Sequence, residues 1–284
     1  MGLVGRCGSM MKEREIKRAV REGYARIAKQ ATSDYASKGC CSSDLPEKIS
    51  RQIGYTEEDL QAAPPESNLG LGCGNPVAMA KIKDGETVLD MGSGAGLDCF
   101  LASTRVGPGG KVIGVDMTTE MVEKARAQAR KGGYTNIDFR QGDLENMPVA
   151  DDYVDVVLSN CVINLVPNKT RAFKEAFRVL KPGGRLAVSD IVLIKELPDF
   201  VRSSTEAYIG CLAGAVMKDD YLGTIRSVGF QDIKVEDESS FPIECLVDSS
   251  SGPGLLEASN VSADDLKKAS ESVSSIKISA AKPK

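Results

Sequence analysis

Cysteines are the residues of this sequence whose type and position most clearly suggest chemistry. The 284-residue chain has eight Cys, no His and no Trp. Without an imidazole, Ser/His/Asp and Cys/His mechanisms are excluded, as are metal sites that need His ligands. No export signal is recognisable, so we expect reduced thiols. Metal, metalloid or redox roles are therefore favoured over structural disulfides.

Cys161 has the most informative position. It directly follows YVDVVLSN, an apolar segment that predicts a buried strand, and it begins CVINLVPNK. Open α/β sheets bind ligands at the carboxyl ends of their strands, so we expect Asn160 and Cys161 to face a ligand. Cys73 in GLGCGNP and Cys211 in YIGCLAGA lie in glycine-containing segments, and Cys40 and Cys41 are adjacent in a polar linker.

The elements that must position these thiols follow an alternating pattern. The segments ETVLDMG, KVIGVD, NIDFRQGD, YVDVVLSN and RLAVSDIVL predict strands, and DCFLASTRV, TTEMVEKARAQARKGG and NKTRAFKEAFRVLKPGG predict helices, the last two closed by glycines. Repeated βα units with short turns predict an α/β fold with a doubly wound parallel sheet.

Less regular segments flank this core. KEREIKRAVREGYARIAKQ predicts an N-terminal helical arm, and residues 1–70 are expected to hold this helix and a Cys-containing loop. Residues 71–198 are the predicted main domain. Residues 199–284 are expected to form a smaller α+β region with helices at DFVRSSTEAYIGCLAGAV, KDDYLGTIRSVGF and DDLKKASES, and strands at QDIKVED and SSIKISAAK.

A glycine-rich turn follows the first strand of the main domain in VLDMGSGAG, residues 88–96. Glycines let a ligand approach the backbone, and a helix start offers free N–H groups. Asp116 ends the second strand, where a carboxylate can bind ribose hydroxyls, and Asp143 ends the third, where it can accept from an adenine amino group. The spacing is G-x-G-x-G, whereas nicotinamide-binding Rossmann domains, the competing interpretation, use G-x-G-x-x-G.

These features, with LKPGG at residues 180–184, resemble the class I S-adenosylmethionine-dependent methyltransferases over roughly residues 70–190. The resemblance implies a Rossmann-like methyltransferase fold with S-adenosylmethionine as the cofactor. It also implies a set of cofactor-binding residues: Asp90, Gly92, Ser93, Gly94, Gly96, Asp116, Met117, Asp143, Leu144 and Asn160.

The acceptor end of the predicted site offers a soft sulfur. The chain lacks the N/D-P-P-Y/F sequence of amide methyltransferases and the His base common in O-methyltransferases. Soft thiolates select soft acceptors such as trivalent arsenic, which binds three thiolates and keeps a lone pair that can attack a sulfonium methyl group. A chain with several cysteines and no His suits that chemistry.

SNCVINLVPNK, GLGCGNP, YIGCLAGA and the Cys pair closely resemble the arsenite S-adenosylmethionine methyltransferases, from about residue 20 to about residue 245. The resemblance implies that Cys73, Cys161 and Cys211 bind As(III). It places an additional catalytic cysteine, used in a disulfide cascade, at Cys41 or Cys40, with Cys41 slightly favoured. The expected substrates are arsenite or its thiol complexes, and glutathione or thioredoxin is the expected reductant in an arsenic-detoxifying reaction.

Three alternatives remain open. The same fold could methylate a small organic substrate, the chain could bind metalloids without turnover, or cysteines could hold a structural zinc, although no C-x-x-C pair is present. Cys99 and Cys245 are expected to pack in the interior. The net charge of −4 and the absence of a long apolar run predict a cytoplasmic protein without a nucleic-acid or membrane partner, and we expect a monomer.

Overall fold

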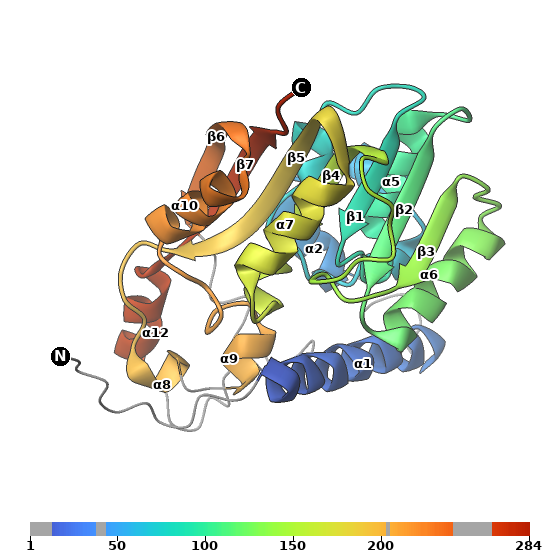
Figure 1. Ribbon diagram of the computed structural model, residues 1–284. Helices are drawn as coiled ribbons and strands as arrows, with labels where there is room; N and C mark the ends of the chain where they lie inside the picture. The colour runs from blue at the N-terminus through green and yellow to red at the C-terminus, as the bar shows by residue number, and fades with distance from the viewer. Residues whose placement is uncertain (1–12, 38–43, 203–204, 241–262) are drawn as a thin grey trace.

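A seven-stranded sheet forms the centre of the molecule in the computed structural model, which describes residues 13–37, 44–202, 205–240 and 263–284 (Figure 1). The strand order is β3-β2-β1-β4-β5-β7-β6. The strands are β1 Thr87–Met91, β2 Lys111–Asp116, β3 Ile137–Gln141, β4 Val154–Asn160, β5 Leu180–Leu193, β6 Gln231–Ser240 and β7 Val273–Ala281. The predicted doubly wound α/β architecture is confirmed.

The predicted parallel arrangement is confirmed for β1 to β5, and two C-terminal strands join them in antiparallel orientation. β7 runs antiparallel to both neighbours, β5 and β6. β5 is long, and its part from Arg185 onward pairs with β7, from Arg185 opposite Ala281 to Leu193 opposite Val273. The strands of the predicted smaller α+β region, residues 199–284, therefore extend the central sheet across the boundary predicted at residue 198.

Helices cover both faces of the sheet. They are α1 Glu13–Ser37, α2 Asp44–Gln52, α3 Glu57–Ala62, α4 Pro76–Met79, α5 Leu97–Val106, α6 Thr119–Lys131, α7 Lys169–Val179, α8 Asp199–Arg202, α9 Thr205–Ile209, α10 Lys218–Val228 and α12 Ala263–Ser270, with short 3-10 turns at Pro65–Ser67 and Ile163–Leu165. No helix in the described ranges is long and apolar enough to cross a membrane.

Two predicted helix ends were wrong. The helix expected to end at Gly183 and Gly184 ends at Val179, and KPGG belongs to β5 because a residue before proline favours extended backbone. The single helix expected through Cys211 is instead the short α8 and α9. Cys211 follows α9 in a turn, with a left-handed φ of 65°.

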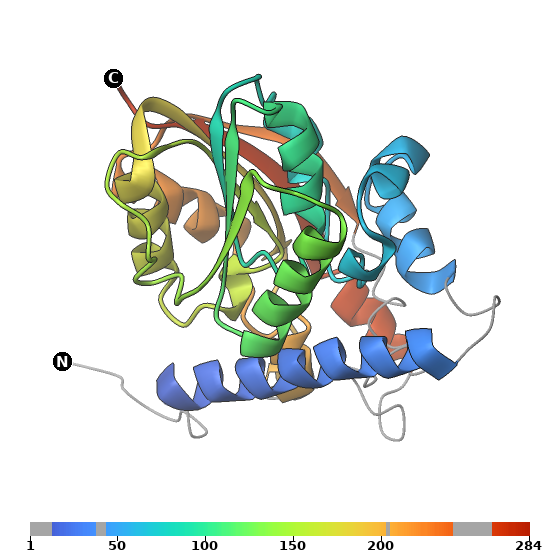
Figure 2. The same cartoon turned by 90° about the vertical axis from the view of Figure 1, so that its right-hand side faces the viewer.

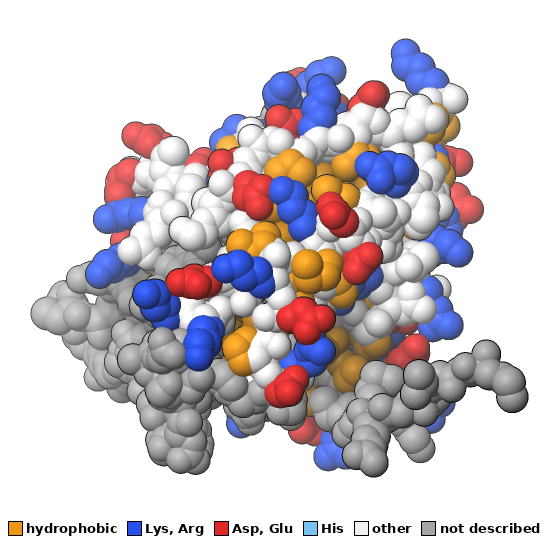
Figure 3. Space-filling view, turned by 90° about the vertical axis from the view of Figure 1, so that its left-hand side faces the viewer, with side chains coloured by type: hydrophobic (Ala, Val, Ile, Leu, Met, Phe, Trp, Pro, Cys, Tyr) orange, Lys and Arg blue, Asp and Glu red, His pale blue; other side chains and the backbone are white. Residues whose placement is uncertain are grey.

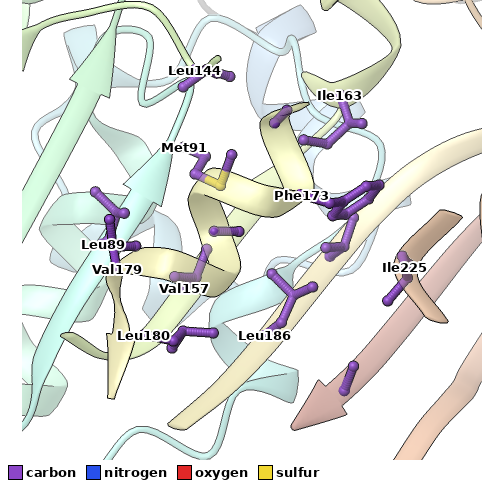
Figure 4. Packing of buried hydrophobic residues seen from close by; sticks show 14 of the residues in the cluster. Leu89, Met91, Leu144, Val157, Ile163, Phe173, Val179, Leu180, Leu186 and Ile225 are labelled. Carbon is purple, nitrogen blue, oxygen red and sulfur yellow. The ribbon is translucent and has the colours of Figure 1, made fainter. Parts of the chain in front are cut away.

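Apolar side chains fill both faces of the sheet. Leu89 and Met91 of β1 point to one side and pack with Phe173 of α7 (Figure 4), whereas the preceding Val88 points to the other side and packs with Phe100 of α5. Each such side chain contributes about 1.5–3 kcal/mol when fully buried. The two-sided core explains why these strands read as continuous apolar runs.

Helix α1 lies along the carboxyl edge of the parallel strands (Figures 1 and 2). It packs against α6 and α9 and buries Val20 and Ala28. The predicted N-terminal helix on the main domain is thus confirmed.

On the face shown in Figure 3, basic and acidic side chains are interspersed.

Candidate active site

The glycine-rich turn between β1 and α5 forms an open cradle at the carboxyl edge of the sheet. Gly92 and Gly94 both have left-handed φ angles, 75° and 50°. A Cβ atom on Gly94 would meet no atom within 4 Å, so this position faces free space. The Ser93 hydroxyl beside it is buried and has no hydrogen-bond partner in the described part of the chain. An unpartnered buried hydroxyl beside an open backbone indicates a ligand site.

Three carboxyl groups surround this cradle, the buried Asp90 and Asp98 and the half-buried Asp116. Asp116 accepts hydrogen bonds from the backbone N–H of Gly94 at 2.9 Å and of Thr118 at 2.8 Å. Burial raises the pKa of Asp116 and raises the pKa of Asp98 to about 6. Burial also raises the pKa of Asp90 well above its ordinary value, and the charge of the nearby Asp98 adds to this shift. A cationic ligand here would offset this cost of burying carboxylates.

A cavity that we call the main cavity opens in front of the cradle and encloses about 1060 Å³, part of it open to solvent. Small-molecule pockets measure roughly 300–1,000 Å³. The predicted cofactor residues that line it are Asp90, Gly92, Ser93, Gly94, Asp116, Met117, Asp143, Leu144 and Asn160. Gly96 does not line it. It caps α5 with a φ of 98°, and a side chain there would strike Phe139.

Helix α1 forms one wall of the main cavity through Lys17, Val20 and Tyr24. The Lys17 ammonium lies 2.6 Å from the Asp143 carboxylate, the group predicted to accept from an adenine amino group. Burial alone would raise the pKa of Asp143, but its pKa is lowered because the hydrogen bonds from Lys17 and from the Glu145 backbone, with the charges of Lys17 and Arg21, together outweigh burial. Sequence reasoning missed Lys17 because its partner lies 126 positions away.

The three predicted arsenic-binding cysteines converge in one buried cluster beside the main cavity. Cys73, Cys161 and Cys211 are all free thiols, and they pack with Val20 of α1 in a common apolar group. Cys161 lies in the middle. Its hydrogen bonds with Cys211 and with Cys73 raise the pKa of its thiol well above the ordinary value, and burial adds to this. Burial also raises the pKa of Cys73.

Glycines explain how the Cys73 loop reaches the strand ends. A Cβ on Gly72 would come within 2.8 Å of the Asn160 amide, and one on Gly74 within 2.0 Å of the Ser189 hydroxyl. Only glycine on both sides lets the backbone lie directly on β4 and β5. Asn160 fixes the loop, because its Oδ1 accepts from Cys73 N at 3.0 Å and its Nδ2 donates to Gly74 O at 2.8 Å.

Asn160 has further bonds that bear on its predicted role as a cofactor contact. Its Nδ2 also lies 2.9 Å from Tyr55 Oη and 3.0 Å from Asp98 Oδ2, so both amide hydrogens have acceptors within the protein. Tyr55 in turn donates to Asp98 at 2.7 Å. This network ties the Cys73 loop to Asp98 beside the cradle. Direct contact between Asn160 and a cofactor stays a prediction.

Backbone strain marks two of the three cysteines. Cys161 and Cys211 have left-handed φ angles of 54° and 65°. This conformation costs about 1–2 kcal/mol for a residue with a side chain. The cluster is held together by Cys161 N, which donates to Ser189 O at 2.8 Å, and by the Cys211 thiol, which lies 2.8 Å from Cys161 O. Strain of this kind concentrates at functional sites.

Asp190 is a buried carboxylate that sequence reasoning missed. One of its oxygens and the sulfurs of Cys73 and Cys161 lie within 4.8 Å of one another. Its oxygens accept from Asn164 Nδ2, from the Ile191 backbone N–H and from the Tyr221 hydroxyl, each at 2.9 Å. The charged residue inside the apolar run AVSDIVL was the available signal.

The other cysteines divide into one interior thiol and several outside the described residues. Cys99 is fully buried in α5 and donates to Asp90 Oδ2 at 3.3 Å. Its predicted place in the core is confirmed. Cys40 and Cys41, the predicted disulfide partners, and Cys245 lie outside the described residues, so those roles stay predictions.

Comparisons with known proteins agree with this geometry. The family described as a methyltransferase domain matches residues 82–229. The chain is 45% identical over 236 residues to an arsenite methyltransferase of Halobacterium salinarum, covering 80% of this chain and 60% of that protein. It is 34% identical over 230 residues to an arsenite methyltransferase of Homo sapiens, covering 78% and 59%. The chain thus spans about 60% of the length of these curated relatives.

Solved structures show the same architecture. An arsenic(III) S-adenosylmethionine methyltransferase from Chlamydomonas reinhardtii superimposes with a TM-score of 0.60 at 32% identity, covering 83% of this chain and 73% of that one. An N-methyltransferase from Haemonchus contortus, solved with S-adenosylhomocysteine, gives a TM-score of 0.58 at 18% identity and covers 75% of this chain and 54% of that one, a likeness of fold alone.

Proposed function

Since this chain belongs to the methyltransferase-domain family and is related within it to the arsenic(III) S-adenosylmethionine methyltransferases, we propose that it methylates trivalent arsenic. The observation that carries the proposal is the convergence of Cys73, Cys161 and Cys211, from three distant segments, into one buried cluster beside the main cavity. Three soft sulfurs suit a soft, three-coordinate acceptor.

The residues of the main cavity fit S-adenosylmethionine. The Gly94 backbone and the unpartnered Ser93 hydroxyl offer room and hydrogen bonding for its amino-acid end, and Asp116 would bind the ribose. The cofactor is cationic, and the carboxyls of Asp90, Asp98 and Asp116 would favour that charge. When bound, it supplies an electrophilic methyl group on a positively charged sulfur.

The thiol cluster would bind arsenic without burying a charge. The pKa values of Cys73 and Cys161 are raised, so these thiols are protonated at neutral pH. As each arsenic–sulfur bond forms, the thiol proton leaves with a displaced hydroxide as water, or with a displaced carrier thiol. The bound arsenic is therefore neutral, which suits an apolar surrounding better than a thiolate-bound divalent cation.

Positioning is the main contribution of the protein. The strained turns at Cys161 and Cys211 and the Asn160 clamp on the Cys73 loop fix the sulfurs before arsenic arrives. Arsenic held there would direct its lone pair toward the methyl group at the carboxyl edge of the sheet, which makes the transfer effectively unimolecular. Arsenic needs no proton removed, so the absence of His is no obstacle.

Methylation formally oxidises arsenic from the trivalent to the pentavalent state. We propose that two cysteine sulfurs then couple as a disulfide, so that their two electrons return arsenic to the trivalent state. Cys41 or Cys40 is the proposed partner, and glutathione or thioredoxin the proposed reductant that restores the thiols. The product would be a methylated arsenical, in a detoxifying reaction.

The test is to incubate the purified protein with S-adenosylmethionine, glutathione and arsenite and to separate the arsenic species by chromatography. We expect methylated arsenicals with wild-type protein and none with a variant in which Cys73, Cys161 and Cys211 are all Ser.

Binding measurements distinguish the alternatives. Arsenite should raise the melting temperature of the wild type and leave that of the triple variant unchanged. Arsenite binding without S-adenosylmethionine binding in calorimetry would favour a metalloid-binding protein without turnover. Cofactor binding without any arsenite effect would favour another methyl acceptor.

A further inference from the structure

The thiol cluster lies between two cavities. Cys161 lines the main cavity, and Cys73 lines a second one, which we call the side cavity. The side cavity encloses about 520 Å³, part of it open to solvent, and is bordered by Gly54 and by β6 and β7 at the far edge of the sheet. The two sulfurs lie within 4.8 Å of each other, so one bound arsenic atom could be approached from both sides.

The main cavity is an unsuitable route for a second reactant. Lys17, Val20 and Tyr24 of helix α1 line one side of the main cavity. The bound cofactor would occupy the space in front of Cys161. The proposed function nevertheless needs thiols at the cluster, because arsenic arrives by thiol exchange and a disulfide must be reduced. A route that avoids the cofactor is therefore required.

The side cavity has the chemistry for an anionic thiol. Lys277 of β7 contributes an ammonium group to the side cavity. This group forms an ion pair at 2.8 Å with the carboxylate of Asp237, whose side chain is half exposed. Ser239 and Ser240 of β6 line the same space. An ammonium group and hydroxyls on one side, with a thiol on another, match a small thiol that carries carboxylates.

The same strand also holds Cys73 in place. Ser275 and Lys277 are two residues apart in β7 and so share a face of the sheet. The Ser275 hydroxyl donates to Cys73 O at 2.7 Å, and the Lys277 side chain lies against Gly74, where a Cβ would be 3.3 Å from its Cε. β7 thus fixes the position of the cysteine and presents the cation beside it.

We propose that the side cavity is the docking site of a small, carboxylate-bearing thiol that exchanges at Cys73 while the cofactor occupies the main cavity. In the exchange, the bond between arsenic and the carrier sulfur breaks, the bond between arsenic and Cys73 forms, and the Cys73 proton passes to the leaving thiol. The arsenic step rests on the proposed function, but the separate access to Cys73 does not.

Alkylation with a matched pair of reagents tests the access. Protein saturated with S-adenosylhomocysteine is treated with neutral iodoacetamide or anionic iodoacetate, and the labelled peptides are quantified by mass spectrometry. We expect Cys161 to be protected and Cys73 to remain reactive. Protection of both cysteines, or no labelling of Cys73 by either reagent, would overturn the proposal.

A charge-reversal variant tests the role of Lys277. The quantity to measure is the ratio of the alkylation rates of Cys73 by iodoacetate and by iodoacetamide. This ratio should fall about tenfold in Lys277→Glu and by a smaller factor in Lys277→Gln. It should not change in the control Lys234→Glu, which alters an exposed lysine of β6. The ratio cancels any change in thiol pKa, and Lys277→Gln avoids repulsion from Asp237. An equal ratio in all variants would contradict the proposal.

Turnover provides the matching readout for the proposed function. Lys277→Glu should raise the KM for glutathione about tenfold and leave the KM for neutral 2-mercaptoethanol unchanged. An equal rise for both thiols would indicate a merely structural role and would contradict the docking site. If the wild type forms no methylated arsenical, the proposed function fails, whereas the alkylation result still decides the access to Cys73.

Discussion

The proposed cofactor side and the thiol side of the site are built in different ways. The cofactor side comes mostly from residues 90–144, where each strand end in turn adds one group to the main cavity. The thiol side combines Cys73 before β1, Cys161 after β4 and Cys211 after α9, and these residues become neighbours only in the folded chain. One side is a local motif, and the other is a tertiary arrangement.

The two sides also differ in backbone and solvation. The cofactor side uses glycines for its left-handed positions and keeps an open cradle at Gly94. The thiol side places two cysteines in left-handed turns and buries them in an apolar group. The comparison indicates that cofactor binding should tolerate changes to the thiols, whereas arsenic binding should depend on the whole fold. Four predictions test this.

The largest expected effect is from Cys161→Ser. Removing the central sulfur should lower arsenite methylation at least a hundredfold, while the Kd for S-adenosylmethionine changes less than twofold, because the cofactor-side groups are untouched. Arsenic speciation and calorimetry measure the two effects. Cys99→Ser is the matched control, a buried thiol outside the cluster whose replacement keeps a donor toward Asp90. Full methylation by Cys161→Ser would end the assignment.

Asn160→Asp should damage the link between the two sides. It removes both donor hydrogens and sets a second carboxylate beside Asp98, so we expect a loss of about 2–3 kcal/mol in unfolding free energy and about tenfold weaker arsenite binding. Urea unfolding and arsenite titration measure these. Asn136→Asp is the control. It loses bonds to Ser103 and Gly107 away from the site, so its stability should fall while arsenite affinity is kept.

Asp116→Asn should act on the cofactor side alone. It weakens the ribose acceptor and the hold on Gly94 N, so the Kd for S-adenosylmethionine should rise about tenfold, equivalent to about 1.4 kcal/mol. The arsenite-induced shift in melting temperature should be unchanged. Asp138→Asn, at an exposed carboxylate paired with Arg140, should leave both unchanged. A parallel loss of arsenite binding would contradict the independence of the two sides.

The smallest expected effect is a pH dependence from Asp98. Burial raises its pKa to about 6 from 3.8, so the folded protein binds more protons than the unfolded chain between these values. The stabilisation is fully present below the lower value and is lost as pH rises through about 6. Lowering the pH from about 7.5 to about 5 should therefore add about 1 kcal/mol of stability from this group. Asp98→Asn should lack that increment in unfolding experiments, and an identical pH profile would refute it.

The sequence by itself predicted the residues of the proposed cofactor side and determined the order of the elements. Apolar segments marked β1 to β5, and the Asp-and-glycine turn placed the cradle, because these signals depend on neighbours within a few positions. It also indicated the three cysteines, through their residue type and their resemblance to a family. It misjudged the end of α7, because the helical pattern was read into LKPGG although the residue before Pro182 favours extended backbone.

Only the tertiary structure decided what surrounds the thiols. The clamp of Asn160 on the Cys73 loop, the salt bridge of Lys17 with Asp143, the buried Asp190 and the side cavity beside Lys277 all join residues far apart in the chain. No spacing rule predicts such pairs, because a buried polar group takes whichever partner the packed chain brings within hydrogen-bonding distance. The sequence supplies the reactive atoms, and the packing of distant segments sets their distances and their access.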